Sequence, residues 1–215
     1  MITIWVPKRL VEIDLYNVAA RSPQALADLS EQSYAQRIDY AAQKVQLSGA
    51  KIVMLTGPSA SGKTTSAHKV AEALEASGTP AHVISLDNFF KGAQYYPRLP
   101  DGTLDYENPD TLDMPLIRQC LSDLSTTGKT VLPIYDFTTE SRSSETETLD
   151  LKGGVCIVEG IHALNDVIVG KNPKAFKLYI AARSNVVDED GAVVFQHPWL
   201  RLCRRTVRDY KFRGS

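Results

Sequence analysis

Eight consecutive residues constrain the fold of this chain more than any other feature of its sequence. The pattern G-x-x-x-x-G-K-[ST] is matched in full by Gly57-Pro58-Ser59-Ala60-Ser61-Gly62-Lys63-Thr64. The apolar run 52–55 before this motif predicts a strand buried on both faces, and segment 63–77 after it predicts a helix closed by Gly78. This strand–loop–helix order is the context that a phosphate-binding loop requires.

The physical chemistry of such a loop indicates that the chain binds a nucleoside triphosphate. Glycines let backbone N–H groups converge on phosphate oxygens, and the positive end of the helix dipole faces the same oxygens. We expect Lys63 to reach the β- and γ-phosphates and the Thr64 hydroxyl to ligate Mg²⁺. The residues predicted to bind ATP here are Gly57, Pro58, Ser59, Ala60, Ser61, Gly62, Lys63, Thr64 and Thr65.

Apolar runs and helical patterns alternate along the rest of the chain. Strands are predicted at 82–86, 130–134, 155–158 and 177–180, and a helix at 113–124. This alternation predicts an α/β fold with a mostly parallel sheet flanked by helices. Before it, Ser22 and Pro23 mark the start of a helix with broken apolar periodicity. We therefore expect an N-terminal helical extension over 1–50 and the sheet domain over 51–215.

Composition excludes several classes of protein. Among 215 residues, 24 Lys and Arg balance 25 Asp and Glu, and a net charge of −1 argues against a general nucleic-acid binder. No apolar run approaches the ~20 residues that span a bilayer. The three cysteines are widely spaced, which favours neither a disulfide framework nor a zinc site. Without a signal-peptide pattern, we expect a reduced, cytoplasmic protein that acts on a small molecule.

Two acidic residues follow predicted strands, at the sheet edge where α/β proteins bind ligands. Asp87 comes directly after strand 82–86, where it would accept a proton from an attacking hydroxyl or hold a metal-bound water. The alternative is that Asp87 caps a short helix over 88–90. Glu159 ends the run 155–158 and fits a role in holding Mg²⁺, with a structural ion pair as its alternative.

Other polar and aromatic residues are candidates for substrate contacts. Arginines recur at helical spacing near the end of the sequence, where Arg201, either Arg204 or Arg205, and Arg208 share one face. We expect this basic helix to close over ATP as a lid, although a solvated face or an RNA-binding patch stays open. His162 follows Glu159 with structural and catalytic roles both open. The aromatic and acidic residues of two further stretches would bind a sugar or a base: Tyr135, Asp136 and Phe137 at another strand end, with Arg142 just beyond, and Tyr106 and Glu107 in a Pro-rich loop.

These motifs, in this order, resemble the uridine kinase and phosphoribulokinase family of P-loop kinases. The resemblance runs from about residue 51 to the end of the sequence and rests on stretches 57–65, 85–90, 108–110, 133–137, 159–161 and 204–214. It implies the P-loop NTPase fold with ATP and Mg²⁺ as cofactors. It also implies transfer of the γ-phosphate to the 5′-hydroxyl of a nucleoside, uridine or cytidine first among them.

The resemblance also implies roles for individual residues. Asp87 corresponds to the catalytic base on the 5′-hydroxyl, while Thr64 and Glu159 serve Mg²⁺. Glu107 stands where the family places an Asp on the ribose hydroxyls, and Tyr135 lies near the nucleoside. The lid residues that match the family's phosphate-binding arginines are Arg205, Arg208 and Arg213.

The sequence departs from the family pattern in ways that keep alternatives open. Glu140 replaces a His that uridine kinases of the family carry near the pyrimidine, and an extra stretch over 184–197 is expected to form a small hairpin. This insertion, the N-terminal helices and the stretch 159–165 resemble a divergent bacterial branch of uridine-kinase-like proteins. Pantothenate, a sugar phosphate or glycerate remain alternative acceptors, and an anionic one would need cations such as Lys91, Arg98 and Arg142.

Three further questions stay open from the sequence. A non-catalytic nucleotide sensor that contacts RNA through the basic helix would also carry the phosphate loop. Family members continue past that helix with more helices and usually a last strand, so the resemblance implies that a C-terminal part is absent or that the sequence is a fragment. A homo-oligomer is compatible with all of these observations.

Overall fold

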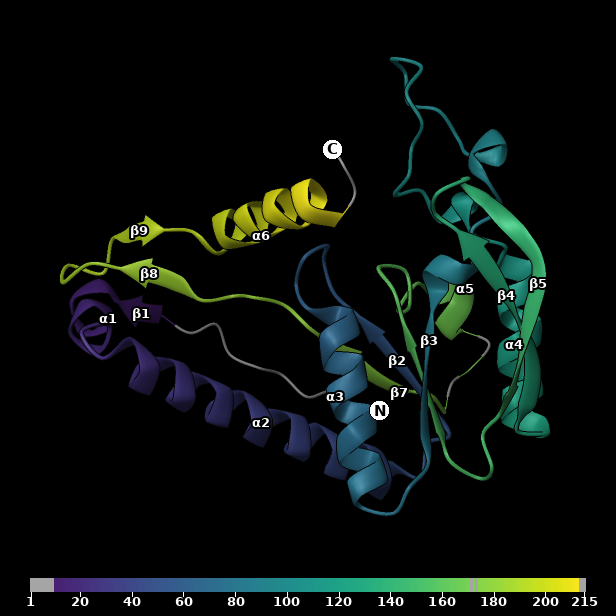
Figure 1. The fold of residues 1–215 in the computed structure, drawn as a ribbon, viewed down its shortest axis with the longest axis horizontal. Helices are drawn as coiled ribbons and strands as arrows, with labels where there is room; N and C mark the ends of the chain where they lie inside the picture. Colours follow the sequence, from purple (N-terminus) through teal and green to yellow (C-terminus); the bar gives the residue numbers. More distant parts are fainter. Residues whose placement is uncertain (1–9, 171, 173, 213–215) are drawn as a thin grey trace.

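A four-stranded parallel sheet forms the centre of the molecule (Figure 1). The computed structural model describes residues 10–212 apart from 171 and 173. The strands of the sheet, in the spatial order β3-β6-β2-β7, are β3 (Ala81–Ser85), β6 (Val155–Glu159), β2 (Ile52–Thr56) and β7 (Phe176–Tyr179). Every neighbouring pair is parallel. The prediction of a mostly parallel α/β sheet is therefore confirmed.

Helices cover both faces of this sheet, as continuous apolar strands require. Along β2, Ile52 and Met54 join a buried cluster with helices α4 (Met114–Thr126) and α5 (Asp166–Val169). Val53 and Leu55 point to the opposite face and join a cluster with α3 (Lys63–Ala76) and the second half of α2 (Pro23–Ser48). The boundary at residue 50 stays a prediction, but α2 contributes to the core of the sheet domain.

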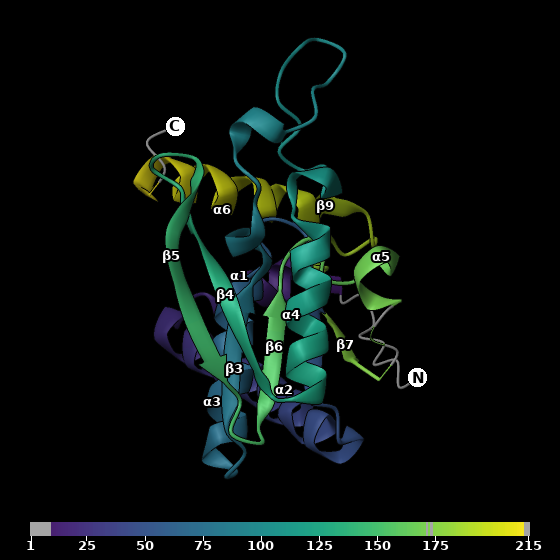
Figure 2. The same cartoon turned by 90° about the vertical axis from the view of Figure 1, so that its right-hand side faces the viewer.

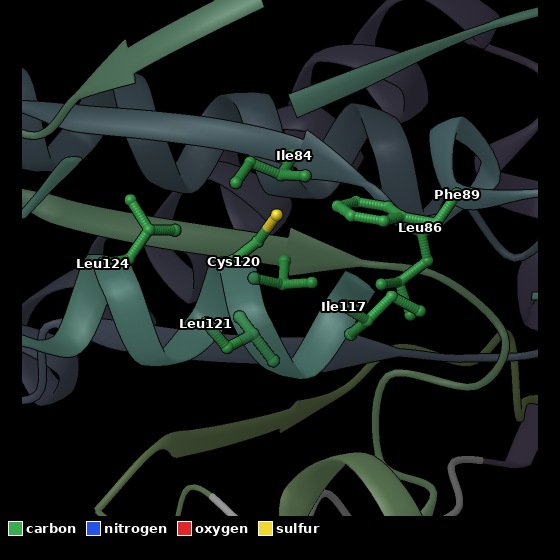
Figure 3. Close-up of a pocket in the computed structure, with 8 residues that line it drawn as sticks. Ile84, Leu86, Phe89, Ile117, Cys120, Leu121 and Leu124 are labelled. Carbon is green, nitrogen blue, oxygen red and sulfur yellow. The ribbon is translucent and has the colours of Figure 1, made fainter. Parts of the chain in front are cut away.

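A very small cavity lies between α4 and the sheet (Figure 3). Its volume is about 10 Å³, and its lining is apolar: Ile84, Leu86, Phe89, Ile117, Cys120, Leu121, Leu124 and Val158. A buried water needs polar partners as well as space, and this lining offers almost none. The cavity is therefore a packing gap in the core and not a ligand site.

A long antiparallel hairpin lies beside the central sheet (Figure 2). Its strands are β4 (Lys129–Asp136) and β5 (Ser141–Asp150). The sequence predicted β4, and Pro133 indicated an edge or a strand end; β4 pairs only with β5 among the described residues. β5 was not predicted because its side chains are mostly polar and exposed, so it lacks the apolar alternation that marks a half-buried strand.

A third, small sheet lies at the far end of α2 from the central sheet (Figure 1). It consists of β1 (Leu10–Glu12), β8 (Asn185–Val187) and β9 (Val193–Phe195) in the order β1-β8-β9. The hairpin expected over 184–197 is confirmed as the antiparallel pair β8–β9. The parallel pairing of β1 with β8 was not predicted. Helix α1 (Ile13–Ala19) joins β1 to α2.

Helix α6 (His197–Phe212) follows this small sheet and is the basic helix expected from the sequence. It lies over the end of the central sheet toward which the strands point (Figure 1). Within the part of the chain that the structure describes, no helix is both long and apolar enough to cross a bilayer.

Candidate active site

The parallel register of the central sheet gathers the predicted site residues at one edge. Glu159, the last residue of β6, is level with Leu55 of β2 on one side and with Ser85 of β3 on the other. The phosphate loop begins two residues after Leu55, and Asp87 lies two residues after Ser85. The sheet therefore holds the loop and both predicted carboxylates as neighbours at the carboxyl ends of its strands.

The phosphate loop makes a tight turn between β2 and α3. A Cβ on Gly57 would lie only 1.9 Å from the backbone oxygen of Ile180, so the loop starts hard against the chain after β7. Gly62 has φ +91° and is the N-cap of α3, and Ala60 also has a positive φ of 60°. The hydroxyl of Ser61 is buried with no hydrogen-bond partner among the described residues. Such an orphaned donor fits a loop that binds phosphate oxygens.

The Thr64 hydroxyl donates to Glu159 Oε1 over 3.0 Å and joins the start of α3 to the end of β6. Glu159 is only 4% exposed, and burial raises the pKa of its carboxyl group. The negative charge of Asp87 raises it further, while hydrogen bonds from Ser85 and Thr64 oppose the rise. A positive charge close to the buried Glu159 carboxylate would therefore stabilise its ionised form.

Lys63 lies within the electrostatic reach of the same two carboxylates. Burial lowers the pKa of its ammonium group, and the charges of Glu159 and Asp87 act against this change. Its Nζ atom donates to the backbone oxygen of Pro58 over 3.3 Å. The positive charges of Arg208 and Arg201 on α6 lower the Lys63 pKa further.

The hydroxyl of Thr64 and the carboxylate of Glu159 are hard oxygen donors of the kind that Mg²⁺ prefers. Among the described residues, no cluster of three or more His, Cys, Asp or Glu side chains would hold a metal alone. The pair therefore fits an ion that takes its other oxygens from phosphates and water, as Mg²⁺ usually does.

Ser85, and not Asp87, caps the short helix that follows β3. Residues Leu86–Phe89 form a 3₁₀ turn, and Ser85 Oγ accepts from the backbone N–H of Asp87 over 3.3 Å. Asp87 lies in the first turn with its side chain half-buried beside Lys63 and Glu159. The capping function thus lies with Ser85, and the Asp87 carboxylate belongs to the charged group at the sheet edge.

Helix α6, the predicted lid, contacts the phosphate loop directly. Arg201 Nε donates to the backbone oxygen of Ser59 over 3.1 Å. Arg205 forms an ion pair of 3.6 Å with Glu107, which brings the lid to the predicted ribose-binding residue. A cavity of about 290 Å³ opens between loop and lid, lined by Pro58, Tyr179, Ala181, Ala182, Arg183, His197 and Arg201. Arg213 lies outside the described residues.

An aromatic cluster begins at Phe90, directly after the 3₁₀ turn that carries Asp87, and comprises Phe90, Tyr96, Tyr106, Tyr135 and Phe137. The hydroxyls of Tyr96 and Tyr135 lie 3.1 Å apart, and burial together with this bond raises the Tyr96 pKa. The sequence indicated Tyr135 and Tyr106 but missed Tyr96, whose position in a Pro-rich loop carries no periodic pattern. The cluster places flat apolar surfaces at the predicted acceptor side.

Arg142 and His162, two further predicted site residues, differ in their hydrogen bonding. Arg142 forms a 3.0 Å ion pair with Asp113, and its NH2 group donates to the backbone oxygens of Phe89 and Phe90 at 3.4 and 3.3 Å. These contacts tie the β5 strand to the turn that carries Asp87. The Nε2 atom of His162 is buried with no hydrogen-bond partner in the described part of the chain.

Comparison with known proteins agrees with this geometry. The family model described as "Phosphoribulokinase / Uridine kinase family" matches residues 52–215. The chain belongs to the phosphoribulokinase / uridine kinase family. The match includes the phosphate loop, both carboxylates and the lid helix.

Relatives within the phosphoribulokinase / uridine kinase family are about a third identical to this chain over the matched residues. The uridine kinase of Macrococcus caseolyticus is 34% identical over 169 residues, which are 78% of this chain and 73% of the relative. The uridine kinase of Lactobacillus helveticus is 31% identical over 163 residues, 76% of this chain and 69% of the relative. These similarities identify the chain as a kinase of the uridine-kinase-like type.

A solved structure described as that of a possible uridine kinase from Bacillus stearothermophilus has the same fold. It superposes with a TM-score of 0.55 at 22% identity and covers 68% of this chain and 80% of the other. The P-loop kinase fold expected from the sequence is confirmed.

Proposed function

We propose that this protein transfers the γ-phosphate of ATP to the 5′-hydroxyl of a nucleoside, uridine or cytidine. The observation that carries the proposal is the set of opposed charges at the sheet edge. The phosphate loop that leads to Lys63 meets Asp87 and Glu159 at neighbouring strand ends there, and Arg201 of α6 donates to the loop at the backbone oxygen of Ser59. Such an arrangement neutralises phosphate charge next to a carboxylate that can accept a proton.

In the proposed reaction the phosphate loop and Lys63 bind the triphosphate. Asp87 accepts the proton of the 5′-hydroxyl while the hydroxyl oxygen forms a bond to the γ-phosphorus. The bond between that phosphorus and the β–γ bridging oxygen breaks, and ADP is released. Thr64 and Glu159 would hold Mg²⁺, which supplies charge neutralisation to the phosphates when bound. The arginines of α6 neutralise charge from the opposite side and exclude water.

The surroundings of three cations support an uncharged acceptor over an anionic one. Lys91 Nζ donates to the backbone oxygen of Asp110 over 2.9 Å, and Arg98 NH1 donates to that of Gly102 over 2.7 Å. Arg142 is paired with Asp113. An anionic pantothenate, glycerate or sugar phosphate would have to compete with these internal partners for each cation.

The aromatic cluster supports a nucleoside for a second reason. Tyr106 and Phe137 are the exposed members of the cluster, and each lies edge-on to a buried tyrosine. Exposed aromatic rings backed by a packed cluster offer a surface on which a planar base can stack.

An acceptor screen tests the proposal. The protein is supplied with ATP, Mg²⁺ and one acceptor at a time: uridine, cytidine, a purine nucleoside, pantothenate, glycerate or ribulose 5-phosphate. Products are identified by mass, and Lys63→Ala serves as the control for contaminating kinases. We expect a monophosphate from uridine or cytidine. ATP binding without a product from any acceptor would favour the nucleotide sensor and contradict the proposal.

A further inference from the structure

Helix α6 is fixed at its first residue by a buried side chain from the 184–197 segment. Asn185 Oδ1 accepts a hydrogen bond from the backbone N–H of His197 over 3.0 Å and lies 2.9 Å from His197 Nδ1. Asn185 is only 6% exposed, whereas His197 is half-buried and also lines the cavity of about 290 Å³ beside the phosphate loop. A hydrogen bond to a buried acceptor at a helix start fixes the direction of the first turn.

The strand that carries Asn185 is held on both sides. On one side β8 pairs in parallel with β1, where Leu10 is level with Asn185 and Glu12 with Val187. On the other side β8 pairs with β9, which leads directly into α6. We call the three strands β1, β8 and β9 the lid root. The N-terminal segment and the insertion, two parts of the sequence without a predicted role, thus build one structure.

The lid root is connected to the phosphate site by a second path. From β1 the chain continues through α1 into α2, whose residues Ile38, Ala42 and Val45 are buried against the central sheet and α3. The Tyr34 hydroxyl of α2 also lies 2.8 Å from Ser66 Oγ of α3. Since α3 begins at Lys63, the root of the lid and the phosphate loop are anchored to the same pair of packed helices.

We propose that Asn185 is a positioning residue for phosphoryl transfer, because it sets the angle at which α6 presents its arginines to the phosphate loop. The inference rests on the proposed function. At 1.5 Å per residue, Arg201 lies roughly 6 Å and Arg208 roughly 16 Å along the helix from His197. A tilt of about 10° at His197 moves Arg208 by roughly 3 Å, which is enough to break a hydrogen bond.

Asn185→Ala and Asn185→Asp test this role in the full chain. Asp keeps an oxygen that accepts from His197, whereas Ala removes it. For Asn185→Ala we expect the KM for ATP to rise about tenfold, and the ATP hydrolysed per phosphate transferred to rise by a similar factor, because lost positioning of the lid admits water. For Asn185→Asp we expect both values within about threefold of wild type.

Leu124→Ala in α4 is the control for a merely structural effect. Leu124 is fully buried in the cluster between α4 and the sheet, which includes no described residue of α6, so its truncation lowers the melting temperature without removing a contact of the lid. We expect its KM for ATP and its ratio of hydrolysis to transfer to match wild type. The inference is overturned if Asn185→Ala shows wild-type values, if it behaves like Leu124→Ala, or if Asn185→Asp is no better than Ala.

Tryptophan fluorescence separates failure of this inference from failure of the proposed function. The chain has two tryptophans, and in a Trp5→Phe background only Trp199 of α6 remains, packed edge-on against Phe195 of the lid root. We expect ATP to change its emission, and Asn185→Ala to need about tenfold more ATP for the same change. If Trp199 emission depends on ATP concentration equally with and without Asn185→Ala, the inference is overturned, whether or not any acceptor is phosphorylated.

Discussion

The Thr64 hydroxyl and Glu159 Oε1 lie 3.0 Å apart, although 95 residues separate them in the chain. This hydrogen bond links the first turn of α3 to the end of β6, because β2 and β6 are neighbours in the parallel sheet. The same pair is where we propose that Mg²⁺ binds. The site therefore depends on sheet register as much as on the residues of the phosphate loop.

Lys63→Ala is expected to abolish turnover. The substitution removes the positive charge that interacts with Glu159 and Asp87 and that we assign to the β- and γ-phosphates. Lys69→Ala, an exposed lysine of the same helix that lies 5.9 Å from the Tyr34 ring centre, is the matched control and is expected to keep wild-type turnover. A coupled ADP-release assay with the preferred acceptor measures both. Residual activity near wild type in Lys63→Ala would remove the lysine from its proposed role.

Asp87→Asn is expected to bind ATP normally and to lose turnover by a factor of about 10² or more, because an amide cannot accept the hydroxyl proton. Asp150→Asn makes the same chemical change at an exposed carboxylate that pairs with Lys129 on the hairpin, and it is expected to be silent. Calorimetric ATP titration and steady-state rates measure the two effects. Unchanged turnover in Asp87→Asn would exclude the residue as general base.

Glu159→Gln is expected to change how stability depends on pH. Burial raises the Glu159 pKa above its ordinary value of about 4.5. At a pH between the ordinary pKa and the raised pKa, the folded state therefore binds more protons than the unfolded state. The free energy of unfolding therefore falls as pH rises through that window, and glutamine removes this fall. Urea unfolding of both proteins between pH 4 and 8, without nucleotide, measures the difference. Parallel pH curves would contradict the assigned pKa direction.

Arg142→Ala is expected to lower the free energy of unfolding by about 1–3 kcal/mol, because it leaves the partly buried carboxylate of Asp113 without its ion pair. Arg118→Ala is the control, since that guanidinium makes one long hydrogen bond of 3.4 Å to Val167 and its loss is expected to cost about 0.5 kcal/mol or less. Urea unfolding measures both. Equal stability of the Arg142 variant and wild type would leave a substrate contact as the better account of this residue.

The sequence was most informative where local chemistry decides the structure. The phosphate loop, the helix that begins at Lys63 and the fully buried strands β2 and β6 each carry a local signal, in glycine spacing or in continuous apolar runs. Because the carboxyl ends of parallel strands share one edge, the proximity of Asp87 and Glu159 also followed from the pattern.

Other features depend on contacts between distant segments, which no local pattern encodes. The pairing of β1 with β8 joins residues more than 170 positions apart through strands of three residues each. The partner of Arg142 is 29 positions away, and Tyr96 meets Tyr135 across 39. In each case packing chooses the partner, so the contacts of Asn185 and Tyr96 emerged only from the structure.

The most direct test of the central claim is a comparison of uridine with 5′-deoxyuridine as acceptors. Each is incubated with the protein, ATP and Mg²⁺, and products are resolved by mass and by ³¹P NMR. The account predicts that uridine yields its 5′-monophosphate and that 5′-deoxyuridine, which lacks the attacking hydroxyl, yields no phosphorylated product. Phosphorylation of 5′-deoxyuridine at the same rate, or of neither nucleoside while ATP binds, would contradict it.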